Sequence, residues 1–315
     1  MRKKILITGG SGFLGKNLGL YLKLKNKYDI FLCSRNIDNL KIVNKQTKCN
    51  VYPLDINNYG SVVKAFSNIQ PDMIVHSAAI KYIDLAEKFP EECFQTNVIG
   101  SLNILRACKT FNIKKLIAIS TDNVTHPEHN IYSLTKSLME KSLILESKRS
   151  KINIACVRFG NLPWSTGSIF PIWSEMSKKQ KIVKSIGPDM TRYFYRVDQA
   201  CSLINFMMKN INNLNGKVVV PDMKAAKIKD ILDVWCKIHK VKWKKIDKRK
   251  GDKEYESIIS PSEYCSFTLK NTNIGKIFLL DILNNKLKKG LNSLNAENFS
   301  TKEIKDLIQK KPKFL

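Results

Sequence analysis

The chain has 315 residues, of which 43% are hydrophobic and 26% are charged. These proportions are typical of a globular protein of one or two domains, and they exclude a disordered chain, a collagen and a small disulfide-stabilised scaffold. Lysine and arginine number 54 against 27 acidic residues, so the formal net charge is +27. Lysines scattered in this way arise by compositional drift, but they also suit an anionic partner such as a phosphorylated ligand or a nucleic acid.

The eight cysteines form no Cys-x-x-Cys pair, and several lie in apolar stretches, as Cys156 does in Ile-Ala-Cys-Val. We therefore expect reduced core residues in a cytoplasmic protein. No apolar run approaches the ~18 residues that cross a membrane. The first ten residues indicate a strand and a glycine turn rather than a signal peptide, so we expect no membrane partner.

Apolar segments that suit buried parallel strands alternate with helical patterns in the first half of the chain. The expected strands are Lys4–Thr8, Ile30–Cys33, Met73–His76, Leu116–Ser120 and Ile152–Arg158, and the expected helices are Leu14–Leu24, Tyr59–Phe66, Glu91–Thr110 and Tyr132–Leu145. This alternation predicts an α/β fold, namely a Rossmann-type doubly wound parallel sheet covered on both faces.

The second half is less regular and predicts a smaller C-terminal α/β lobe. Its expected elements are a short strand at Lys217–Pro221 and helices at Val197–Met208, Ile228–Ile238 and Thr301–Gln309. A sheet of this type usually binds a dinucleotide, so we place a cofactor-binding Rossmann domain at residues 1–159 and a mainly substrate-binding lobe at residues 160–315. The boundary is approximate, and segments of the two parts can interleave.

Three glycines, Gly9, Gly12 and Gly15, follow the first expected strand and open the first expected helix. In this setting Gly9 permits a tight turn, Gly12 lets the backbone approach a pyrophosphate, and Gly15 lets helix and strand pack closely. The pyrophosphate is then held at the helix N-terminus, where unpaired N–H groups and the helix dipole favour an anion. The segment therefore predicts a dinucleotide site.

The end of the second strand indicates which dinucleotide binds. NAD enzymes usually carry an acidic residue there, which accepts hydrogen bonds from the ribose hydroxyls, whereas this chain has Ser34 and Arg35. A hydroxyl and a guanidinium suit a 2′-phosphate, which favours NADP over NAD. Asp55, between the expected strands Ile30–Cys33 and Met73–His76, is expected to accept from the adenine amino group.

Tyr132 and Lys136 stand four residues apart on an expected helix and so share one of its faces. We expect the Lys136 ammonium to lower the pKa of the Tyr132 phenol and to hold the nicotinamide ribose. The tyrosinate then takes a hydroxyl proton as hydride leaves. Downstream of the glycine turn, and after a strand that ends in Ser120 and Thr121, this pair resembles the extended short-chain dehydrogenase/reductases.

Further segments narrow the resemblance to the polysaccharide-biosynthesis branch of that superfamily. This CapD- and PseB-like branch includes the inverting UDP-N-acetylglucosamine 4,6-dehydratases. The matching segments, in chain order, are His76–Tyr82, Glu91–Gly100, Ser120–Asn123, Val157–Asn161, Thr166–Ser168, Met190–Tyr193, Arg249–Glu256, Leu291–Ser293 and Phe299–Glu303. The resemblance covers nearly the whole chain.

The resemblance implies a UDP-sugar substrate, most often UDP-N-acetylglucosamine, and dehydration through transient oxidation at carbon 4. Tyr132 would deprotonate the carbon-4 hydroxyl, Thr121 would steady its oxygen, and Asp122 would protonate the hydroxyl that leaves carbon 6. The 4-ketone acidifies the proton at carbon 5, and the hydride returns at carbon 6, so no net oxidation occurs.

The resemblance also implies two sets of contacts and an oligomer. Besides the residues already named, cofactor contacts are expected at Thr8, Ser11, Phe13, Leu14, Ile56, Ala78, Ala79 and Asn97. Substrate contacts are expected at Lys81, Asn161, Thr166, Arg192, Arg249 and Glu256. The forked donors of the two arginines suit a diphosphate clamp. We expect a homo-oligomer, a dimer or larger, formed through the helices Glu91–Thr110 and Tyr132–Leu145.

The chain departs from the family at the reacting end. Asn123 stands where the family has the lysine proposed as the carbon-5 base, and an amide does not accept a proton at neutral pH. Near the expected sugar pocket, Trp164, Thr166 and Lys250 replace the usual glycine, arginine and proline.

Three functions therefore stay open at this point. The first is a 4,6-dehydratase with another base, for which Lys81 and His126 are candidates. The second is a UDP-sugar 4-epimerase or 4-ketoreductase, which needs only the tyrosine, lysine, threonine and NADP. The third is a binding protein that holds a nucleotide sugar without turnover. The retained Asp122 favours the first function.

Two other kinds of site are not expected. His126 and His129 have the gap of a ligand pair, but Pro127 lies between them and we expect no carboxylate or thiol cluster around them, and so no metal. Trp235, Trp243 and the lysine-rich run 240–250 are compatible with nucleic-acid binding. No known nucleic-acid motif accompanies them, so a nucleic-acid-binding module is a remote alternative.

Overall fold

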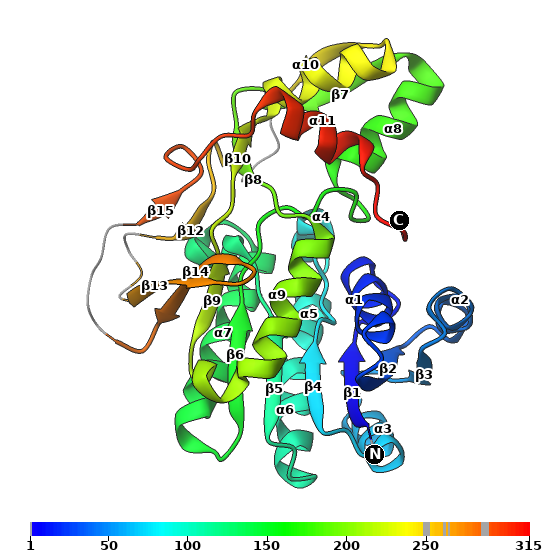
Figure 1. Cartoon of the computed structure of the whole chain (residues 1–315), viewed down its shortest axis with the longest axis vertical. Coiled ribbons are helices and arrows are strands. Elements are labelled where there is room, and N and C mark those ends of the chain that lie inside the picture. The colour runs from blue at the N-terminus through cyan, green and yellow to red at the C-terminus, as the bar shows by residue number, and fades with distance from the viewer. Residues whose placement is uncertain (1, 248–252, 261–262, 264, 285–289) are drawn as a thin grey trace.

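The computed structural model describes residues 2–247, 253–260, 263, 265–284 and 290–315. These residues form two lobes (Figure 1). The lower lobe in this view is built on a large sheet with helices packed against it. The upper lobe carries three helices, namely α8 (Ile169–Gln180), α10 (Ile228–His239) and α11 (Thr301–Gln309).

The large sheet has nine strands in the order β13-β14-β9-β6-β5-β4-β1-β2-β3. In chain order they are β1 (Lys3–Thr8), β2 (Tyr28–Ser34), β3 (Asn50–Pro53), β4 (Met73–His76), β5 (Lys115–Ile119), β6 (Asn153–Val157), β9 (Val218–Pro221), β13 (Ser266–Thr272) and β14 (Gly275–Asp281). Neighbours from β3 to β9 pair in parallel, whereas the hairpin β13–β14 adds an antiparallel edge. The predicted doubly wound Rossmann-type sheet is confirmed.

Helices connect the parallel strands as the apolar pattern predicts. They are α1 (Phe13–Leu24), α2 (Ile37–Thr47), α3 (Tyr59–Ile69), α4 (Ile83–Lys88), α5 (Pro90–Phe94), α6 (Gly100–Thr110), α7 (Ile131–Arg149) and α9 (Val197–Asn210). α1 packs against α9 and α2, while α6 packs against α3 and α7. The expected single helix 91–110 contains a π-helical turn, Gln95–Ile99, between α5 and α6. In the described ranges no helix is long and apolar enough to cross a membrane.

The upper lobe is built from short paired strands and an aromatic core. β7 (Ile182–Ile186) pairs with β11 (Lys242–Ile246), β8 (Thr191–Tyr193) with β10 (Ala225–Lys227), and β12 (Ser257–Ile259) with β15 (Leu291–Asn292). Trp235 is fully buried among Trp164, Phe170 and Trp173, at ring-centroid distances of 5.8 to 6.0 Å. Trp235 is therefore not available for stacking on a nucleic-acid base.

Trp164 lies in this core, and the prediction that it stands near the sugar pocket is wrong. Its side chain is 2% exposed, and its ring N–H donates to the carbonyl of Leu307 at 3.0 Å. Its backbone has a φ of +65°, a left-handed conformation that favours glycine. A tryptophan is held there because its ring packs against Phe170 and Trp235.

The two lobes are interleaved in sequence. After residue 159 the chain forms α8, β7 and β8 in the upper lobe, returns to the sheet with α9 and β9, and later adds β13 and β14 to the sheet. A cut at residue 159 therefore does not divide the lobes cleanly. The assignment of the second half as substrate-binding stays a prediction.

Arg158, directly after β6, fastens the sheet to the segment around β12. Its guanidinium is 1% exposed and lies 2.6 Å from carboxylate oxygens of both Glu140, on α7, and Glu263. It also donates to the carbonyl of Ile258 at 3.0 Å. Removing one partner of such a buried pair leaves an uncompensated charge, which typically costs ~3–5 kcal/mol. The contact fixes β12 beside the carboxyl ends of the central strands.

His76 closes β4 at the centre of the sheet. Its ring nitrogens lie 2.8 Å from the hydroxyl oxygens of Thr8 and Ser101, so it ties β4 to β1 and α6. Burial, together with the nearby Lys136 ammonium, lowers the pKa of His76 to about 3. The imidazole is therefore neutral in the folded protein.

We predict that His76 makes the fold acid-sensitive. Its pKa is about 6.5 in the unfolded chain and about 3 in the folded protein. Between these values the unfolded state binds a proton that the folded state excludes. Stability therefore falls as pH decreases from about 6.5 toward 3, with a slope of up to ~1.4 kcal/mol per pH unit. Urea unfolding at several pH values should show a shallower slope for His76→Asn, and parallel curves for the two proteins would contradict this.

Candidate active site

The glycine turn lies at the carboxyl end of β1 and forms a tight cradle. Gly9 has a φ of +65°, and a Cβ there would lie 2.8 Å from the backbone nitrogen of Ala78. The Gly12 N–H donates to the carbonyl of Gly9 at 2.9 Å. A Cβ on Gly15 would overlap that same carbonyl. Side chains are thus excluded where α1 begins, as close approach of a pyrophosphate requires.

The other predicted residues of this turn support it from both sides. Gly12 is the N-cap of α1, and Phe13 and Leu14 bury the first turn of the helix in the core. The buried Thr8 hydroxyl accepts the backbone N–H groups of Ser77 and Ala78, each at 3.1 Å. Ser11 is half-buried within the turn. The turn and the loop after β4 are therefore held together across the top of the sheet.

Arg35 and Asp55, predicted to contact the cofactor, line one cavity of about 340 Å³ with Lys64. Asp55 accepts the backbone N–H of Asn57 at 3.0 Å, and the Ile56 side chain is buried. Ser34, beside Arg35, has a buried hydroxyl oxygen without a hydrogen-bond partner among the described residues. The cradle, the orphaned hydroxyl and the basic cavity fit a dinucleotide that crosses from α1 to the end of β2.

Asn97 holds the loop that follows β4 in place. The side chain is 1% exposed, and its amide binds the backbone N–H and carbonyl of Ile80 at 2.8 and 3.0 Å. It also donates to the hydroxyl of Thr135 on α7, at 3.1 Å. Asn97 therefore positions the loop that contains Ala78 and Ala79, both of which are half-buried.

The predicted pair Tyr132 and Lys136 lies in the first two turns of α7. Lys136 is 5% exposed and donates to the carbonyl of Ile119 at 2.6 Å, and burial lowers its pKa to about 8. Burial raises the pKa of Tyr132, with further contributions from Asp122 and Cys93, while the Thr121 hydroxyl opposes the rise. Burial therefore dominates the pKa of Tyr132 in this structure, and its lowering by Lys136 stays a prediction.

Thr121, Asp122 and Asn123 follow β5 and begin a short 3-10 turn, Asp122–Thr125. One carboxyl oxygen of Asp122 accepts from the Thr121 hydroxyl at 2.9 Å and from the Asn123 amide at 3.2 Å. The other oxygen is buried and has no hydrogen-bond partner within the described ranges. Burial and the neighbouring Glu256 carboxylate raise the pKa of Asp122 well above its ordinary value. The shift favours the protonated form of this carboxyl group.

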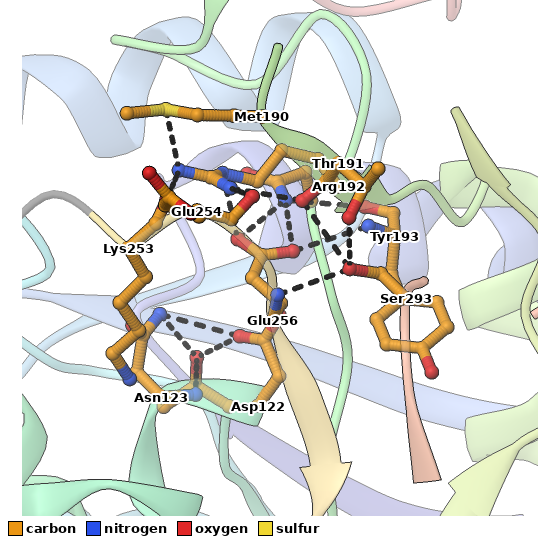
Figure 2. Close-up of polar contacts among 12 residues, drawn as sticks. Asp122, Asn123, Met190, Thr191, Arg192, Tyr193, Lys253, Glu254, Glu256 and Ser293 are labelled. Atoms are coloured by element: carbon orange, nitrogen blue, oxygen red, sulfur yellow. Dashed lines mark hydrogen bonds and ion pairs between the residues drawn. The ribbon is translucent and has the colours of Figure 1, made fainter. Parts of the chain in front are cut away.

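Glu256 comes from the second half of the chain and is held over Asp122 by several donors (Figure 2). Its carboxylate accepts from the Asn161 amide and from the backbone N–H of Tyr193, all at 3.1 Å. Its own N–H donates to the Ser293 hydroxyl at 3.0 Å. The predicted substrate residues Asn161 and Glu256 are thus brought together, and they bind each other.

Arg192 is the centre of the same cluster rather than a free cation. Its guanidinium lies 3.3 Å from Glu256 and donates to the carbonyl of Lys253 at 2.7 Å and to that of Thr191 at 2.8 Å. These contacts fix the segment 253–256, which Figure 2 shows passing above Asp122 and Asn123. The diphosphate clamp stays a prediction for Arg192, and Arg249 and Lys250 lie outside the described residues.

The remaining predicted substrate residues, Lys81 and Thr166, meet at the edge of the site. The Lys81 ammonium donates to the backbone carbonyl of Thr166 at 2.7 Å and lies over the ring of Tyr82. Burial lowers the pKa of Lys81. This contact joins the loop after β4 to the loop before α8, one from each lobe.

Contrary to expectation, a carboxylate accompanies the two histidines that lie between the 3-10 turn Asp122–Thr125 and α7. Ligand atoms of His126, Glu128 and His129 lie within 4.8 Å of one another. His126 and His129 are 3.6 and 3.7 Å from Glu128. Glu128 is exposed, and burial and the neighbouring Lys253 ammonium lower the pKa of His126. The neighbouring ammonium opposes a metal cation, so we assign no metal here.

The parallel sheet, the glycine cradle and the Tyr132–Lys136 pair beside Thr121 define an extended short-chain dehydrogenase/reductase. A family model described as "Polysaccharide biosynthesis protein" matches residues 5–282. The chain belongs to this family of nucleotide-sugar epimerases and dehydratases.

Similar proteins extend over the full length of the chain. A protein of Rickettsia bellii named UDP-glucose 4-epimerase is 28% identical over 331 residues, which cover 97% of this chain and 95% of the relative. The crystal structure of Pen from Bacillus thuringiensis is 26% identical, with a TM-score of 0.87, and covers 98% and 97% of the two chains. dTDP-glucose 4,6-dehydratase from Bacillus anthracis, solved with NAD, is 19% identical over 79% of this chain and 86% of its own, and its TM-score of 0.68 shows a shared fold.

One functional feature that sequence reasoning missed is Lys253. Its ammonium is half-buried and faces the carboxyl groups of Asp122, Glu256 and Glu128. The residue lies in the predicted motif 249–256, but its place beside Asp122 depends on a contact between segments some 130 residues apart. Only its place three residues before Glu256 could have drawn attention to it.

Proposed function

We propose that this chain is a nucleotide-sugar 4,6-dehydratase that uses NADP and acts on UDP-N-acetylglucosamine or a close relative. The observation that carries the proposal is the buried carboxyl group of Asp122 beside Tyr132, which has one oxygen without a hydrogen-bond partner among the described residues and a pKa raised by burial and by Glu256. A dehydratase needs an acid for the hydroxyl that leaves carbon 6, whereas chemistry confined to carbon 4 does not.

The residues with proposed roles in binding and catalysis lie near the carboxyl ends of β1, β4 and β5. The glycine cradle holds the pyrophosphate, Tyr132 takes the proton of the carbon-4 hydroxyl, and Thr121 holds its oxygen. A bound oxidised nicotinamide would supply a positive charge that lowers the pKa of Tyr132, and a hydride acceptor for carbon 4. Asp122 then gives its proton to the leaving hydroxyl.

A second candidate is a UDP-sugar 4-epimerase or 4-ketoreductase. Asn123 favours it, because the amide donates to Asp122 and is not a base. The name of the Rickettsia relatives, UDP-glucose 4-epimerase, points the same way. Both candidate functions use Tyr132, Lys136 and Thr121. They differ in whether the carbon-6 hydroxyl is lost.

The deciding experiment is incubation of the purified protein with UDP-N-acetylglucosamine in heavy water, followed by mass spectrometry and proton NMR. The proposal predicts loss of one water and deuterium at carbon 5. A product of unchanged mass that is epimeric at carbon 4 would establish the epimerase instead. No product until NADPH and a 4-keto sugar are supplied would establish the reductase.

We predict that Asp122→Asn stops dehydration and spares the first half of the reaction. An amide holds the hydrogen bonds of Thr121 but has no proton to give, so kcat should fall by ~10²–10⁴. Reduced nicotinamide should still form on addition of substrate, and its absorbance measures this. Asp38→Asn, at an exposed acid paired with Lys41, is the matched control. Full dehydration by Asp122→Asn would contradict the role of the acid.

Preference for NADP is proposed from Arg35 and Lys64, which line the same cavity as Asp55. Arg35→Asp removes one donor to a 2′-phosphate, and a hydrogen bond to a charged group is worth ~1.5–3 kcal/mol. NADP should therefore bind ~10–100-fold more weakly by calorimetry, while NAD binding is retained. Arg2→Asp, at an exposed position, serves as the control. Equal loss for both dinucleotides would refute the assignment.

A homo-oligomer is also proposed, through α5–α6 and α7. These helices carry exposed apolar side chains, namely Phe94, Leu102, Leu134, Leu138 and Leu145, as an interface between copies requires. Sedimentation should show a dimer or larger assembly that Leu138→Glu dissociates and Leu294→Glu, at an exposed site elsewhere, does not. A monomeric wild type would disprove this. Cytoplasmic location stays a prediction from the sequence.

A further inference from the structure

Dehydration at carbons 5 and 6 needs a group that takes the carbon-5 proton, and the described catalytic residues leave this position open. Asp122, whose pKa is raised by burial and by Glu256, is the proposed acid. Tyr132 works at carbon 4, and the amide of Asn123 cannot accept a proton. Lys81, one candidate from the sequence, is directed to the carbonyl of Thr166 at 2.7 Å.

We propose that Lys253 is this base, an inference that rests on the dehydratase function proposed above. Figure 2 shows its side chain running from the segment above the site toward Asn123 and Asp122. Its ammonium interacts electrostatically with the carboxyl groups of Asp122, Glu256 and Glu128. It therefore reaches the place beside the acid that Asn123 cannot fill.

The backbone that carries Lys253 is held at successive positions, so the direction of its side chain is defined. Its carbonyl accepts from Arg192 at 2.7 Å. The carbonyl of Glu254 accepts the backbone N–H of Thr191 at 2.9 Å. Glu256 donates its N–H to Ser293 at 3.0 Å, and its carboxylate is held by Asn161. In this cluster Arg192 and Glu256 are positioning residues.

The charge state of Lys253 suits the role. The groups that face it are the carboxyls of Asp122, Glu128 and Glu256, the Arg192 guanidinium and the His126 imidazole. The carboxyls raise its pKa and Arg192 lowers it, but burial has the largest effect, so the pKa lies below that of an ordinary lysine. Burial therefore increases the fraction of neutral amine, which is the form that accepts a proton.

The proton transfers balance. The carbon-5–hydrogen bond breaks and its proton goes to the Lys253 amine, while the electron pair forms the carbon-5–carbon-6 double bond. The carbon-6–oxygen bond breaks, and the leaving oxygen takes the Asp122 proton to become water. When the hydride returns at carbon 6, carbon 5 takes a proton back from Lys253. The proton that left the carbon-4 hydroxyl replaces the one that Asp122 lost.

Two substitutions separate a base from a mere positive charge. Lys253→Met removes both, whereas Lys253→Arg keeps the charge but stays protonated at neutral pH. With UDP-N-acetylglucosamine in heavy water, both variants should lose dehydration and carbon-5 deuterium incorporation by ~10²–10⁴. Both should still form reduced nicotinamide and bind UDP as the wild type does, which shows that the fold and the carbon-4 step are intact. Lys179→Met, at an exposed lysine paired with Glu175, should behave as wild type.

Several outcomes would overturn the proposal, and they differ from failure of the proposed function. If the wild type releases no water, the dehydratase function itself fails. If the wild type dehydrates and Lys253→Met does so equally, Lys253 is not the base. Recovery of activity in Lys253→Arg would show that Lys253 contributes only its positive charge. Weaker UDP binding with unchanged kcat would show that Lys253 only contacts the substrate. Loss of carbon-5 exchange in His126→Gln alone would transfer the role to His126.

Discussion

A carboxyl group buried next to a second carboxylate is the constraint on which this active site depends. Asp122 begins the 3-10 turn that follows the central strand β5, and Glu256 is brought to it by a segment from the far half of the chain. Two neighbouring negative charges in a buried place are unfavourable, and this raises the pKa of Asp122. The hydrogen-bond donors are divided unequally between the two carboxyl groups. Glu256 accepts from Asn161, Tyr193 and Arg192, whereas one oxygen of Asp122 accepts no bond from the described residues.

The rest of the structure keeps these two carboxyl groups in place. Arg158 fastens β12 to the sheet through Glu140 and Glu263, so the segment before β12 cannot move away from the catalytic turn without breaking a buried ion pair. Thr125 adds a direct bond from the turn to the carbonyl of Ser257 at 3.1 Å. The environment of Asp122 therefore depends on the contact between the two lobes. The Tyr132–Lys136 pair, by contrast, lies within the lobe that contains the large sheet.

This division explains what could be predicted from the sequence. The cofactor end is local: Gly9, Gly12 and Gly15 fall within seven residues, and Tyr132 and Lys136 share one face of a helix. The central strands of the Rossmann sheet are buried over most of their length, so their order of appearance indicates the fold class. The spacing of Tyr132 and Lys136 did not reveal that burial of the phenol raises its pKa, and the lowering of that pKa by Lys136 stays a prediction.

The substrate end depends on contacts between distant segments, and there the sequence was less informative. Asn161, Arg192 and Glu256 were predicted as substrate residues, but their contacts with one another were not predicted. Trp164 was expected at the sugar because it replaces a glycine, yet its ring fills the aromatic core of the upper lobe. The hairpin β13–β14 and α8 were also not predicted, since short amphipathic segments resemble loops until the surface they cover is known.

The most direct test of this account is the protonation state of Asp122 at neutral pH. Infrared difference spectroscopy of the wild type against Asp122→Asn reports it, because a protonated carboxyl group and a carboxylate absorb differently. The account predicts a protonated carboxylic acid band at pH 7 that is lost in Asp122→Asn and diminished in Glu256→Gln, where the neighbouring charge is absent. A spectrum with only the carboxylate form at pH 7 would show that Asp122 has no proton to donate, and the acid on which the proposed dehydration depends would be missing.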